Sequence, residues 1–456
     1  MRRGDFSWRE IDWRSPLDAF APLAESPFAA LLHSGGGDAR WSVLAGSPAA
    51  TLEAREGRTF IDGSRVAASP FDALRALAAS RVLSPNAAPD APFLTGLIGF
   101  VGYEMGGLLE SSAKGPASPF ALPDMAFAAY DAAALFDNRE KRAFIAARDG
   151  AAAARLEETL GREAPQRAAP IFTGFTSNFT ADDYRAMVAN VVELIRDGVL
   201  FQANVAQHFQ AMSEGPARAF DLFRVIAAEA APFAAFLPYK EGAVLSNSPE
   251  RFFRIEGAGR IVAEPIKGTR PRGGDHARDM ALAAELLADP KERAENIMIA
   301  DLTRNDLSRI CRDGSIREEA ICALESHAHV HHLVSRISGV LREGIGAVEA
   351  LETLFPCGSI TGAPKIEAMK TIAAAEGVGR GPYCGAVGYI DDRGLADFAV
   401  AIRTMIVEEK AGRLCATFPA GGGVTLRSDP QAEYLETLVK AKGALRALSI
   451  DEARAS

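Results

Sequence analysis

The chain is organised around the stretch Ala263-Glu264-Pro265-Ile266-Lys267-Gly268-Thr269-Arg270-Pro271-Arg272, which begins at the end of a strand-like segment. Gly268 has no side chain, so another backbone segment or a ligand can approach closely at this point. Lys267 can act there as a point charge for an anion or, when desolvated, as a nucleophile with a lowered pKa. The ordinary alternative is a surface lysine at the end of a strand. The stretch alone does not distinguish these roles for Lys267, and other parts of the sequence are needed.

The composition predicts a globular chain with a large core. The chain has 456 residues, of which 48% are apolar and 24% are charged, enough for two or three ordinary domains or one large two-layer enzyme. The net charge of -9 argues against nucleic acid as a bulk electrostatic partner. A small anionic substrate remains compatible, because a local basic pocket can exist in an acidic protein.

Five cysteines with no Cys-x-x-Cys spacing predict reduced thiols in a cytoplasmic protein. The N-terminus reads Met1-Arg2-Arg3-Gly4-Asp5 and continues without the apolar segment of a signal peptide. No run of about 18 apolar residues occurs, so we expect no membrane-spanning helix.

The pattern of elements predicts the α+β class. Helical periodicity follows Thr180 and covers 218–230 and 276–306, whereas strand-like segments include 93–103, 199–210, 243–247, 383–390, 397–408 and 413–418. Strands and helices do not alternate regularly, so we expect large antiparallel sheets packed as a sandwich-like core with flanking helices. A segment rich in alanine, charge and proline suggests a boundary between an N-terminal region, 1–165, which contributes strands to the core, and a catalytic domain, 170–450.

Two predicted helices each carry Glu-x-x-Glu. Glu292 and Glu295 lie on one helical face, as do Glu433 and Glu436, with Lys440 one turn further along. Partly buried salt bridges or a solvated face would explain each pair separately. If the helices meet over a cleft, four carboxylates would repel one another unless a hard divalent cation such as Mg²⁺ joined them.

Two glycine-containing loops and one arginine suggest anion binding. The segment from Phe355 to Lys365 opens a helix, whose amide groups suit an anion, but it departs from a nucleotide-binding loop at Pro364. Gly421-Gly422-Gly423 could expose further amide donors, or form only a tight turn. Arg403 stands within an apolar strand-like segment and requires a carboxylate partner from the protein or a ligand.

A histidine cluster supports a competing interpretation. His327, His329, His331 and His332 could contribute to a zinc site, which would suit a non-enzymatic metal-binding scaffold subunit. Core or solvated histidines are the more common explanation, because no cysteine or second histidine cluster completes the ligand set.

These motifs, in this order, resemble those of the chorismate-utilising enzymes, most strongly from Thr180 to Leu445. The motifs that carry the resemblance are Leu245-Ser246-Asn247-Ser248-Pro249-Glu250-Arg251-Phe252, Ile266-Lys267-Gly268-Thr269-Arg270, Arg293-Ala294-Glu295-Asn296-Ile297-Met298, Asp301-Leu302-Thr303-Arg304-Asn305-Asp306-Leu307, the Gly358 to Lys365 loop, and Ser428-Asp429-Pro430 followed by Glu436-Thr437.

The resemblance implies a role for each matching residue. Glu295 and Glu436 correspond to Mg²⁺ ligands, with Glu292 and Glu433 close by, and the ion would hold the ring carboxylate of chorismate. Glu250 corresponds to the general acid that protonates the departing C4 hydroxyl, and His332 to a histidine near C4. The carboxylate-binding groups would be Thr361, Tyr383, Arg403, Lys440 and the amides of Gly421, Gly422 and Gly423.

Two positions discriminate among the members of the family. Isochorismate and salicylate synthases carry a water-activating lysine where this chain has Gln202, so the resemblance implies that ammonia is the nucleophile. Anthranilate synthases have alanine at the position of Lys267, whereas aminodeoxychorismate synthases have lysine. The lysine would add at C2 as the C4 hydroxyl leaves, and ammonia would then enter at C4. Anthranilate synthesis is the alternative.

The resemblance also implies partners. The chain contains no glutaminase segment and no lyase domain, so ammonia would come from a separate glutamine amidotransferase subunit. A downstream aminodeoxychorismate lyase would make 4-aminobenzoate for folate. Relatives line a tryptophan pocket with a Leu-Leu-Glu-Ser-like motif, which here reads Leu31-Leu32-His33-Ser34. We therefore expect no tryptophan binding.

Overall fold

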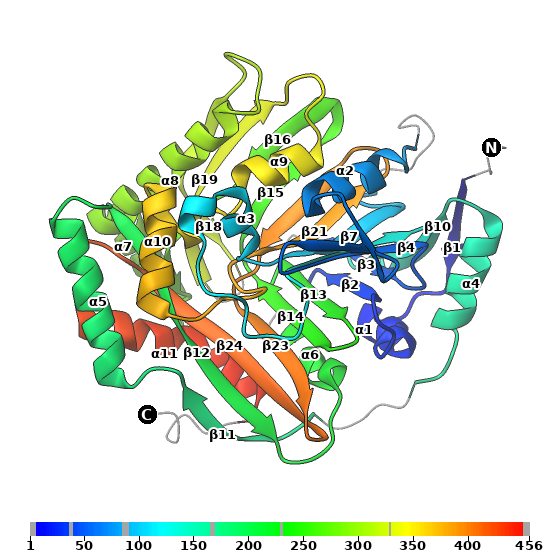
Figure 1. Cartoon of the computed structure of the whole chain (residues 1–456), viewed down its shortest axis with the longest axis horizontal. Helices are drawn as coiled ribbons and strands as arrows, with labels where there is room; N and C mark the ends of the chain where they lie inside the picture. The colour runs from blue at the N-terminus through cyan, green and yellow to red at the C-terminus, as the bar shows by residue number, and fades with distance from the viewer. Residues whose placement is uncertain are drawn as a thin grey trace.

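The computed structural model describes residues 6–35, 40–83, 91–164, 169–228, 231–327 and 330–449. Two large sheets form its centre, and helices cover them (Figure 1). Every strand pairing in these described ranges is antiparallel. The α+β prediction with large antiparallel sheets and flanking helices is confirmed.

The first sheet contains twelve strands. In spatial order they are β1 (Ser7–Ile11), β10 (Arg142–Ala147), β9 (Ala132–Asp137), β3 (Trp41–Ala45), β2 (Ala30–His33), β13 (Phe233–Pro238), β14 (Gly242–Ser248), β23 (Thr404–Lys410), β24 (Arg413–Val424), β12 (Gln202–Ser213) and β11 (Phe172–Ser177), with β20 (Gly362–Ala363) paired to β12.

The second sheet also contains twelve strands. In spatial order they are β17 (Ile266–Pro271), β19 (Val330–Val340), β16 (Arg260–Ala263), β15 (Arg251–Ile255), β22 (Ala396–Val400), β21 (Ala386–Asp391), β7 (Gly96–Val101), β8 (Met125–Tyr130), β4 (Ala50–Arg55), β5 (Arg58–Ile61) and β6 (Ser64–Val66), with β18 (Arg317–Ser326) paired to β19. Both sheets combine strands from either side of the predicted boundary near residue 165, which itself stays a prediction.

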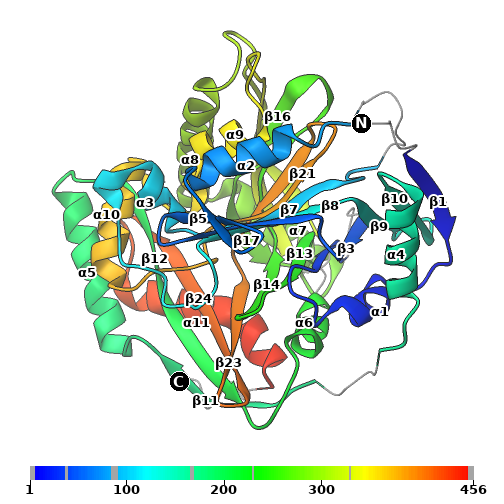
Figure 2. The same ribbon diagram turned by 45° about the vertical axis from the view of Figure 1, so that its right-hand side comes forward.

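Helices flank the sheets. They are α1 (Pro16–Phe20), α2 (Pro70–Ala79), α3 (Met105–Leu109), α4 (Gly150–Leu160), α5 (Ala181–Arg196), α6 (Ala219–Ala227), α7 (His276–Ala288), α8 (Pro290–Ser308), α9 (Ala347–Leu354), α10 (Lys365–Glu376) and α11 (Pro430–Ala447). Figures 1 and 2 agree in placing α5, α10 and α11 together on one side of the molecule, with α1 and α4 on the other. No helix in the described ranges is long and apolar enough to cross a membrane.

Local sequence explains the helix ends near the site. Thr180 accepts a hydrogen bond from the amide of Asp183 and so caps α5, as its capping box predicts. The predicted single helix over 276–306 is instead two helices. Asp289 has an extended backbone between them and accepts hydrogen bonds from the amides of Lys291 and Glu292, and Pro290 begins α8.

Two of the points at which the chain passes from one sheet to the other lie side by side. Strand β14 of the first sheet is followed by β15 of the second, with Glu250 between them, and β22 of the second is followed by β23 of the first, with Arg403 between them. The crossings are joined because the amide of Val400 donates to the carbonyl of Glu250, and that of Asn247 to the carbonyl of Arg403. Two predicted site residues are thus held at the junction of the sheets.

A buried ion pair ties α10 to the strand that carries Gln202. The side chains of Arg380 and Glu376 are each 1% exposed and bonded to each other. Arg380 also donates to the carbonyls of Asn204 and Ile360, and Glu376 accepts from the amide of Ala206. This Arg380–Glu376 pair therefore fixes the start of β12 against the loop that precedes α10.

We predict that Arg380→Met destabilises the protein by about 3–5 kcal/mol, because it leaves the Glu376 carboxylate buried without its partner. Thermal unfolding of the variant measures this loss. Arg304→Met is the control, since Arg304 is 52% exposed in its pair with Asp301 and exposed pairs contribute about 0–1 kcal/mol. Equal unfolding temperatures for the two variants would show that the Arg380–Glu376 pair does not hold the fold.

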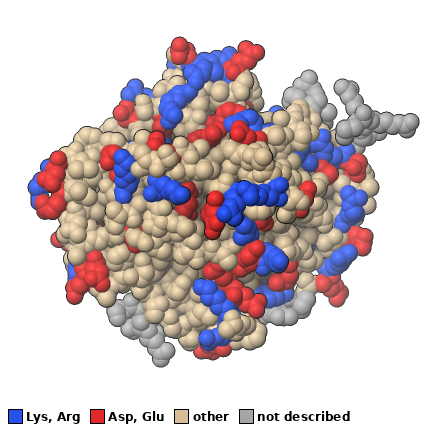
Figure 3. Space-filling model, viewed as in Figure 1, with Lys and Arg blue, Asp and Glu red and all other residues tan. Residues whose placement is uncertain are grey.

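Charged side chains of both signs are distributed over the face in Figure 3. This mixed pattern accompanies the net charge of -9, and it is consistent with a protein whose cationic groups are used locally rather than as one extended basic surface.

Candidate active site

Lys267 lies where the two sheets face each other. Its Nζ donates to the carbonyl of Ser359 at 3.0 Å, and its charge interacts with the carboxylates of Glu250, Glu295 and Glu436. These carboxylates come from the sheet junction, from α8 and from α11. The lysine is therefore the common neighbour of the acidic residues, and the surface-lysine interpretation is wrong.

Gln202 lies beside Lys267. A side chain at Gly423 would collide with the Gln202 amide nitrogen and would lie 3.5 Å from the Lys267 Nζ, so glycine at 423 leaves the space in which these groups meet. Gln202 is fully buried, and neither polar atom of its side chain has a hydrogen-bond partner among the described residues. Because such groups cost free energy unless they are satisfied, Gln202 is suited to contact a bound ligand.

Glu250 is a buried carboxyl group adjacent to Lys267. Burial raises its pKa, and this effect exceeds the opposing ones of the Ser359 hydroxyl and the Lys267 charge. One carboxyl oxygen, Oε1, is buried without a partner in the described structure. A carboxyl group that keeps its proton to higher pH is suited to act as a general acid.

We predict that activity falls as pH rises through the raised pKa of Glu250, because the protonated form is the acid. Glu250→Gln should lower kcat/KM by about 10²–10⁴-fold and remove that alkaline decline. Steady-state rates between pH 6 and about 9 measure both effects. Glu367→Gln, in an exposed pair with Lys370, is the control. A Glu250→Gln enzyme that keeps the wild-type rate and pH profile would exclude the acid role.

The two Glu-x-x-Glu pairs, for which the sequence left a meeting of the helices open, lie close together. A side chain at Gly422 would lie 2.9 Å from an oxygen of Glu433 and 3.2 Å from one of Glu436, and Glu295 interacts electrostatically with Glu292 and Glu433. Burial is the main cause of the raised pKa of Glu295 and of Glu433. The charges of Glu292 and Glu433 raise the pKa of Glu295 further, and the charge of Glu436 raises that of Glu433. These acidic groups from α8 and α11 destabilise one another's ionised forms.

This carboxylate cluster fits a hard divalent cation. One oxygen of Glu295 is buried with no hydrogen-bond partner among the described residues, which leaves it available as a ligand. No group of three or more His, Cys, Asp or Glu side chains in the described ranges forms a ready-made metal cage. Mg²⁺ does not need one, because it binds through one or two carboxylates and completes its coordination with water and substrate oxygens.

Lys440 contacts the carboxylate of Glu436 at 2.7 Å and the carbonyl of Gly421 at 2.8 Å. Its role in binding a substrate carboxylate stays a prediction, whereas the predicted glycine loop is wrong. Residues 421–423 are not a loop but the end of strand β24, paired to β12. The amides of Asn204 and Ala206 point away from β24.

Alternation along the β12–β24 ladder then fixes the directions of the glycine amides. The Gly422 amide faces Val205, its register partner in β12. The Gly421 and Gly423 amides point away from β12. Two of the three predicted amide donors are therefore on the open side of the strand.

Arg403 is not inside a strand. The predicted strand over 397–408 breaks at 401–403, because β22 and β23 belong to different sheets, and Arg403 has a φ of 49°. Non-glycine residues rarely adopt this left-handed conformation, and where they do the surroundings enforce it. The crossing between the sheets places Arg403 near His332, whose pKa its charge helps to lower.

His332 is buried and faces Thr269, with 2.9 Å between its Nδ1 and the Thr269 hydroxyl. Burial lowers its pKa to about 4, so the ring is neutral at pH 7. His331 points elsewhere, to Ser326 and Asp279. His329 lies outside the described residues, and the described histidines form no metal-binding group.

Thr361 and Tyr383 are placed less directly. The Thr361 hydroxyl donates to the carbonyl of Cys357 at 2.9 Å, within the same loop as Ser359. Tyr383 is buried beside Arg380, whose guanidinium lies 5.8 Å from its ring. Sequence reasoning missed Ser359, because its backbone carbonyl leaves no signal in the sequence. It also missed the Arg380–Glu376 pair, because an ion pair at i,i+4 spacing is usually exposed, whereas this one is buried.

The fold and the site together define a chorismate-binding enzyme. The family model described as chorismate binding enzyme matches residues 28–446, and the chain belongs to this family. It is 37% identical over 441 residues to aminodeoxychorismate synthase component 1 of Salmonella typhimurium, covering 94% of this chain and 95% of that protein.

Two further relatives are named as anthranilate synthases. The chain is 36% identical over 470 residues to anthranilate synthase component 1 of Streptomyces coelicolor, covering 97% of this chain and 88% of that protein. The crystal structure of anthranilate synthase component I from Streptococcus pneumoniae superposes with a TM-score of 0.77 at 32% identity, covering 89% of this chain and 92% of that one. Family membership makes the non-enzymatic scaffold interpretation untenable.

Proposed function

We propose that the chain aminates chorismate at C4, forming 4-amino-4-deoxychorismate with ammonia supplied by a separate glutamine amidotransferase subunit. The observation that carries the proposal is the position of Lys267, which contacts the Ser359 carbonyl at 3.0 Å and interacts with the buried acid Glu250. A potential nucleophile and a potential acid therefore lie close enough to interact. The relatives named aminodeoxychorismate synthase component 1 support the same activity.

The reaction has two displacement steps. In its unprotonated form, Lys267 attacks C2 of chorismate, both ring double bonds shift by one position, and the C4 hydroxyl leaves as water after Glu250 donates its proton. Ammonia then attacks C4, both double bonds shift back, and the C2–Nζ bond breaks to release the lysine as a neutral amine. The proton lost from the new C4 amine returns to Glu250. Atoms and charges balance, and the enzyme is regenerated.

The remaining residues position the substrate. Gln202 provides amide hydrogen bonds without the basicity needed to activate water. Arg403 and the amides of Gly421 and Gly423 are suited to the carboxylates of chorismate, with Thr361 and Tyr383 in turns that precede β20 and β21. Glu295 and Glu436 would hold Mg²⁺, assisted by Glu292 and Glu433, and the ion would bind the ring carboxylate as a Lewis acid. The five cysteines, all unpaired, support a cytoplasmic location.

The product assay tests this proposal. We expect purified enzyme incubated with chorismate, Mg²⁺ and ammonium to give no fluorescent anthranilate, and to give 4-aminobenzoate only after an aminodeoxychorismate lyase is added. Anthranilate formed without lyase would instead establish anthranilate synthesis, the second candidate, which the Streptomyces coelicolor relative favours.

A separate cavity bears on regulation. His33, Arg251 and Arg336 line a space of 680 Å³. Burial lowers the pKa of His33 to about 4, so this side chain is neutral at pH 7 and provides no negative charge for an ammonium group. The proposal that tryptophan does not bind rests on this residue.

A further inference from the structure

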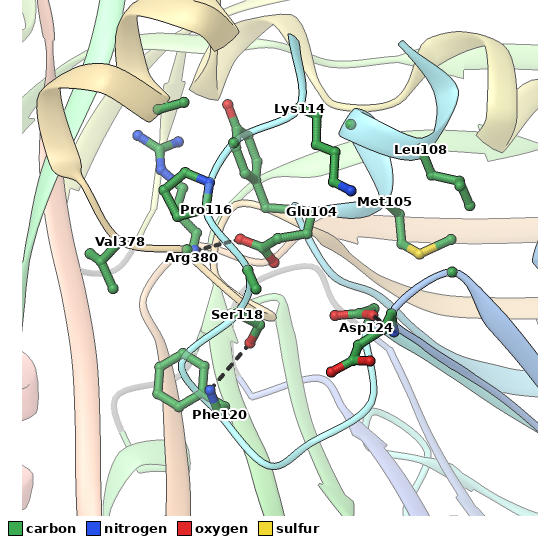
Figure 4. Close-up of a pocket in the computed structure, with 18 of the residues that line it drawn as sticks. Glu104, Met105, Leu108, Lys114, Pro116, Ser118, Phe120, Asp124, Val378 and Arg380 are labelled. Carbon is green, nitrogen blue, oxygen red and sulfur yellow. Dashed lines mark hydrogen bonds between the residues drawn. The ribbon is translucent and has the colours of Figure 1, made fainter. Parts of the chain in front are cut away.

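A cavity of about 840 Å³ lies between segments 103–124 and 369–380, outside the proposed active site. Its size falls within the range of small-molecule sites. Its apolar lining includes Met105, Leu108, Met369 and Val378, which could enclose a hydrocarbon or aromatic group. Figure 4 shows Glu104, Lys114 and Asp124 extending from separate parts of the chain toward this space.

The carboxyl groups of Glu104 and Asp124 and the phenol of Tyr103 are among the oxygen groups that line this cavity. The charges of Glu104 and Asp124 repel each other, and the charge of Glu104 raises the pKa of Tyr103. Tyr103 is 9% exposed, and its hydroxyl has no hydrogen-bond partner among the described residues. Burial raises the pKa of Glu104 to about 7, with Asp124 contributing to the increase, although two backbone amides donate to its carboxylate.

Two of the arginines that line the cavity are engaged elsewhere, and the other cationic side chains of the lining, Arg58 and Lys114, are exposed. Arg380 is bonded to Glu376, Asn204 and Ile360. Arg55 is bonded to Glu53, Glu241 and the carbonyl of Ala121. A primary ammonium group has three N–H donors, which matches two carboxylates and one phenol oxygen.

We propose that this cavity is a second ligand site that binds a primary amine carried on a small apolar or aromatic group. The ammonium group would lie among Glu104, Asp124 and Tyr103, and the apolar group would contact the methionine, leucine and valine side chains. This cavity is distinct from the proposed active site around Lys267. Binding of the amine there does not depend on the amination reaction.

The cavity is linked to the active site by hydrogen bonds. The amide of Arg380 donates to Glu104 at 2.6 Å, and its guanidinium donates to the carbonyls of Asn204 and Ile360. These carbonyls belong to the segments that carry Gln202 and Ser359. An amine that changes the position of Glu104 would therefore alter chorismate turnover; this second effect rests on the proposed function.

Calorimetric titration of the full chain with benzylamine, without substrate, tests the site itself. We expect one equivalent to bind and phenylacetate not to bind. Glu104→Gln and Asp124→Asn should each weaken binding at least about tenfold, the loss of one charge-assisted hydrogen bond. Glu110→Gln, on the same segment but outside the lining, should bind as the wild type does. Lys114→Met removes a positive charge from the lining and should bind benzylamine at least as tightly as the wild type.

The opposite results would overturn the proposal. These are no benzylamine binding by the wild type, unchanged binding in Glu104→Gln and Asp124→Asn, or phenylacetate binding that Lys114→Met abolishes. Because the titration contains no chorismate, its failure would leave the proposed function intact. A benzylamine-dependent change in the KM for chorismate that Glu104→Gln removes would establish the link to the active site, whereas a constant KM at saturating amine would refute that link.

Discussion

Lys267→Ala is expected to reduce formation of 4-amino-4-deoxychorismate by at least about a thousandfold, as loss of a covalent nucleophile does. The variant should remain folded, because Lys267 is only half buried and its one hydrogen bond in the described structure goes to the Ser359 carbonyl. Any remaining turnover should give anthranilate, since without addition at C2 ammonia can attack that carbon itself. Chromatography of the products after single and multiple turnovers measures both effects.

A matched series separates charge from nucleophilicity. Lys267→Arg keeps a cation among Glu250, Glu295 and Glu436 but cannot add to the ring, because arginine remains protonated. It should be as inactive in C4 amination as Lys267→Ala. Lys370→Ala removes an exposed lysine paired with Glu367 and should leave the rate unchanged. Wild-type product formation by Lys267→Arg would show that the lysine acts only through its charge.

Glu436→Gln and Glu295→Gln are each expected to lower activity by at least about a hundredfold, since a metal ion contributes several kcal/mol of charge stabilisation. Each variant removes one negative ligand from the cluster formed by α8 and α11. The affinity for the metal ion should fall together with the activity. It can be measured by paramagnetic resonance with Mn²⁺ in place of Mg²⁺, with and without chorismate. This readout does not depend on turnover.

Lys440→Met provides the necessary comparison for Glu436. Lys440 contacts Glu436 at 2.7 Å, so Glu436→Gln also removes an ion pair. If Glu436 acts as a metal ligand, Lys440→Met should retain Mn²⁺ binding while Glu436→Gln loses it. Equal Mn²⁺ affinity in the wild type and Glu436→Gln, or full activity in the presence of a chelator, would contradict the magnesium proposal.

Local sequence predicted the elements that depend on local interactions. The cap at Thr180 and the apolar stripe of Tyr184, Val188, Val191 and Ile195 are present in α5 and buried as expected. The spacing of Glu292 with Glu295, and of Glu433 with Glu436, placed each pair on one helical face. That the two pairs meet could be stated only conditionally, because helix packing is a long-range property.

Two errors near the site concern strands. Residues 397–408 carry strand-forming residues throughout, so nothing local indicates that Arg403 turns the chain from one sheet to the other. Likewise, Gly421, Gly422 and Gly423 have a loop-like composition, yet the pairing with β12 makes them a strand. Tertiary pairing overrides local preference in both cases.

The most direct test of the central claim is the position of the new nitrogen. The enzyme is incubated with chorismate, Mg²⁺ and ¹⁵N-labelled ammonium, and the product is examined by carbon–nitrogen couplings in its NMR spectrum. Amination through Lys267 predicts that ¹⁵N is bonded to C4 of a product that retains the enolpyruvyl group. A product with ¹⁵N bonded to C2 would contradict it.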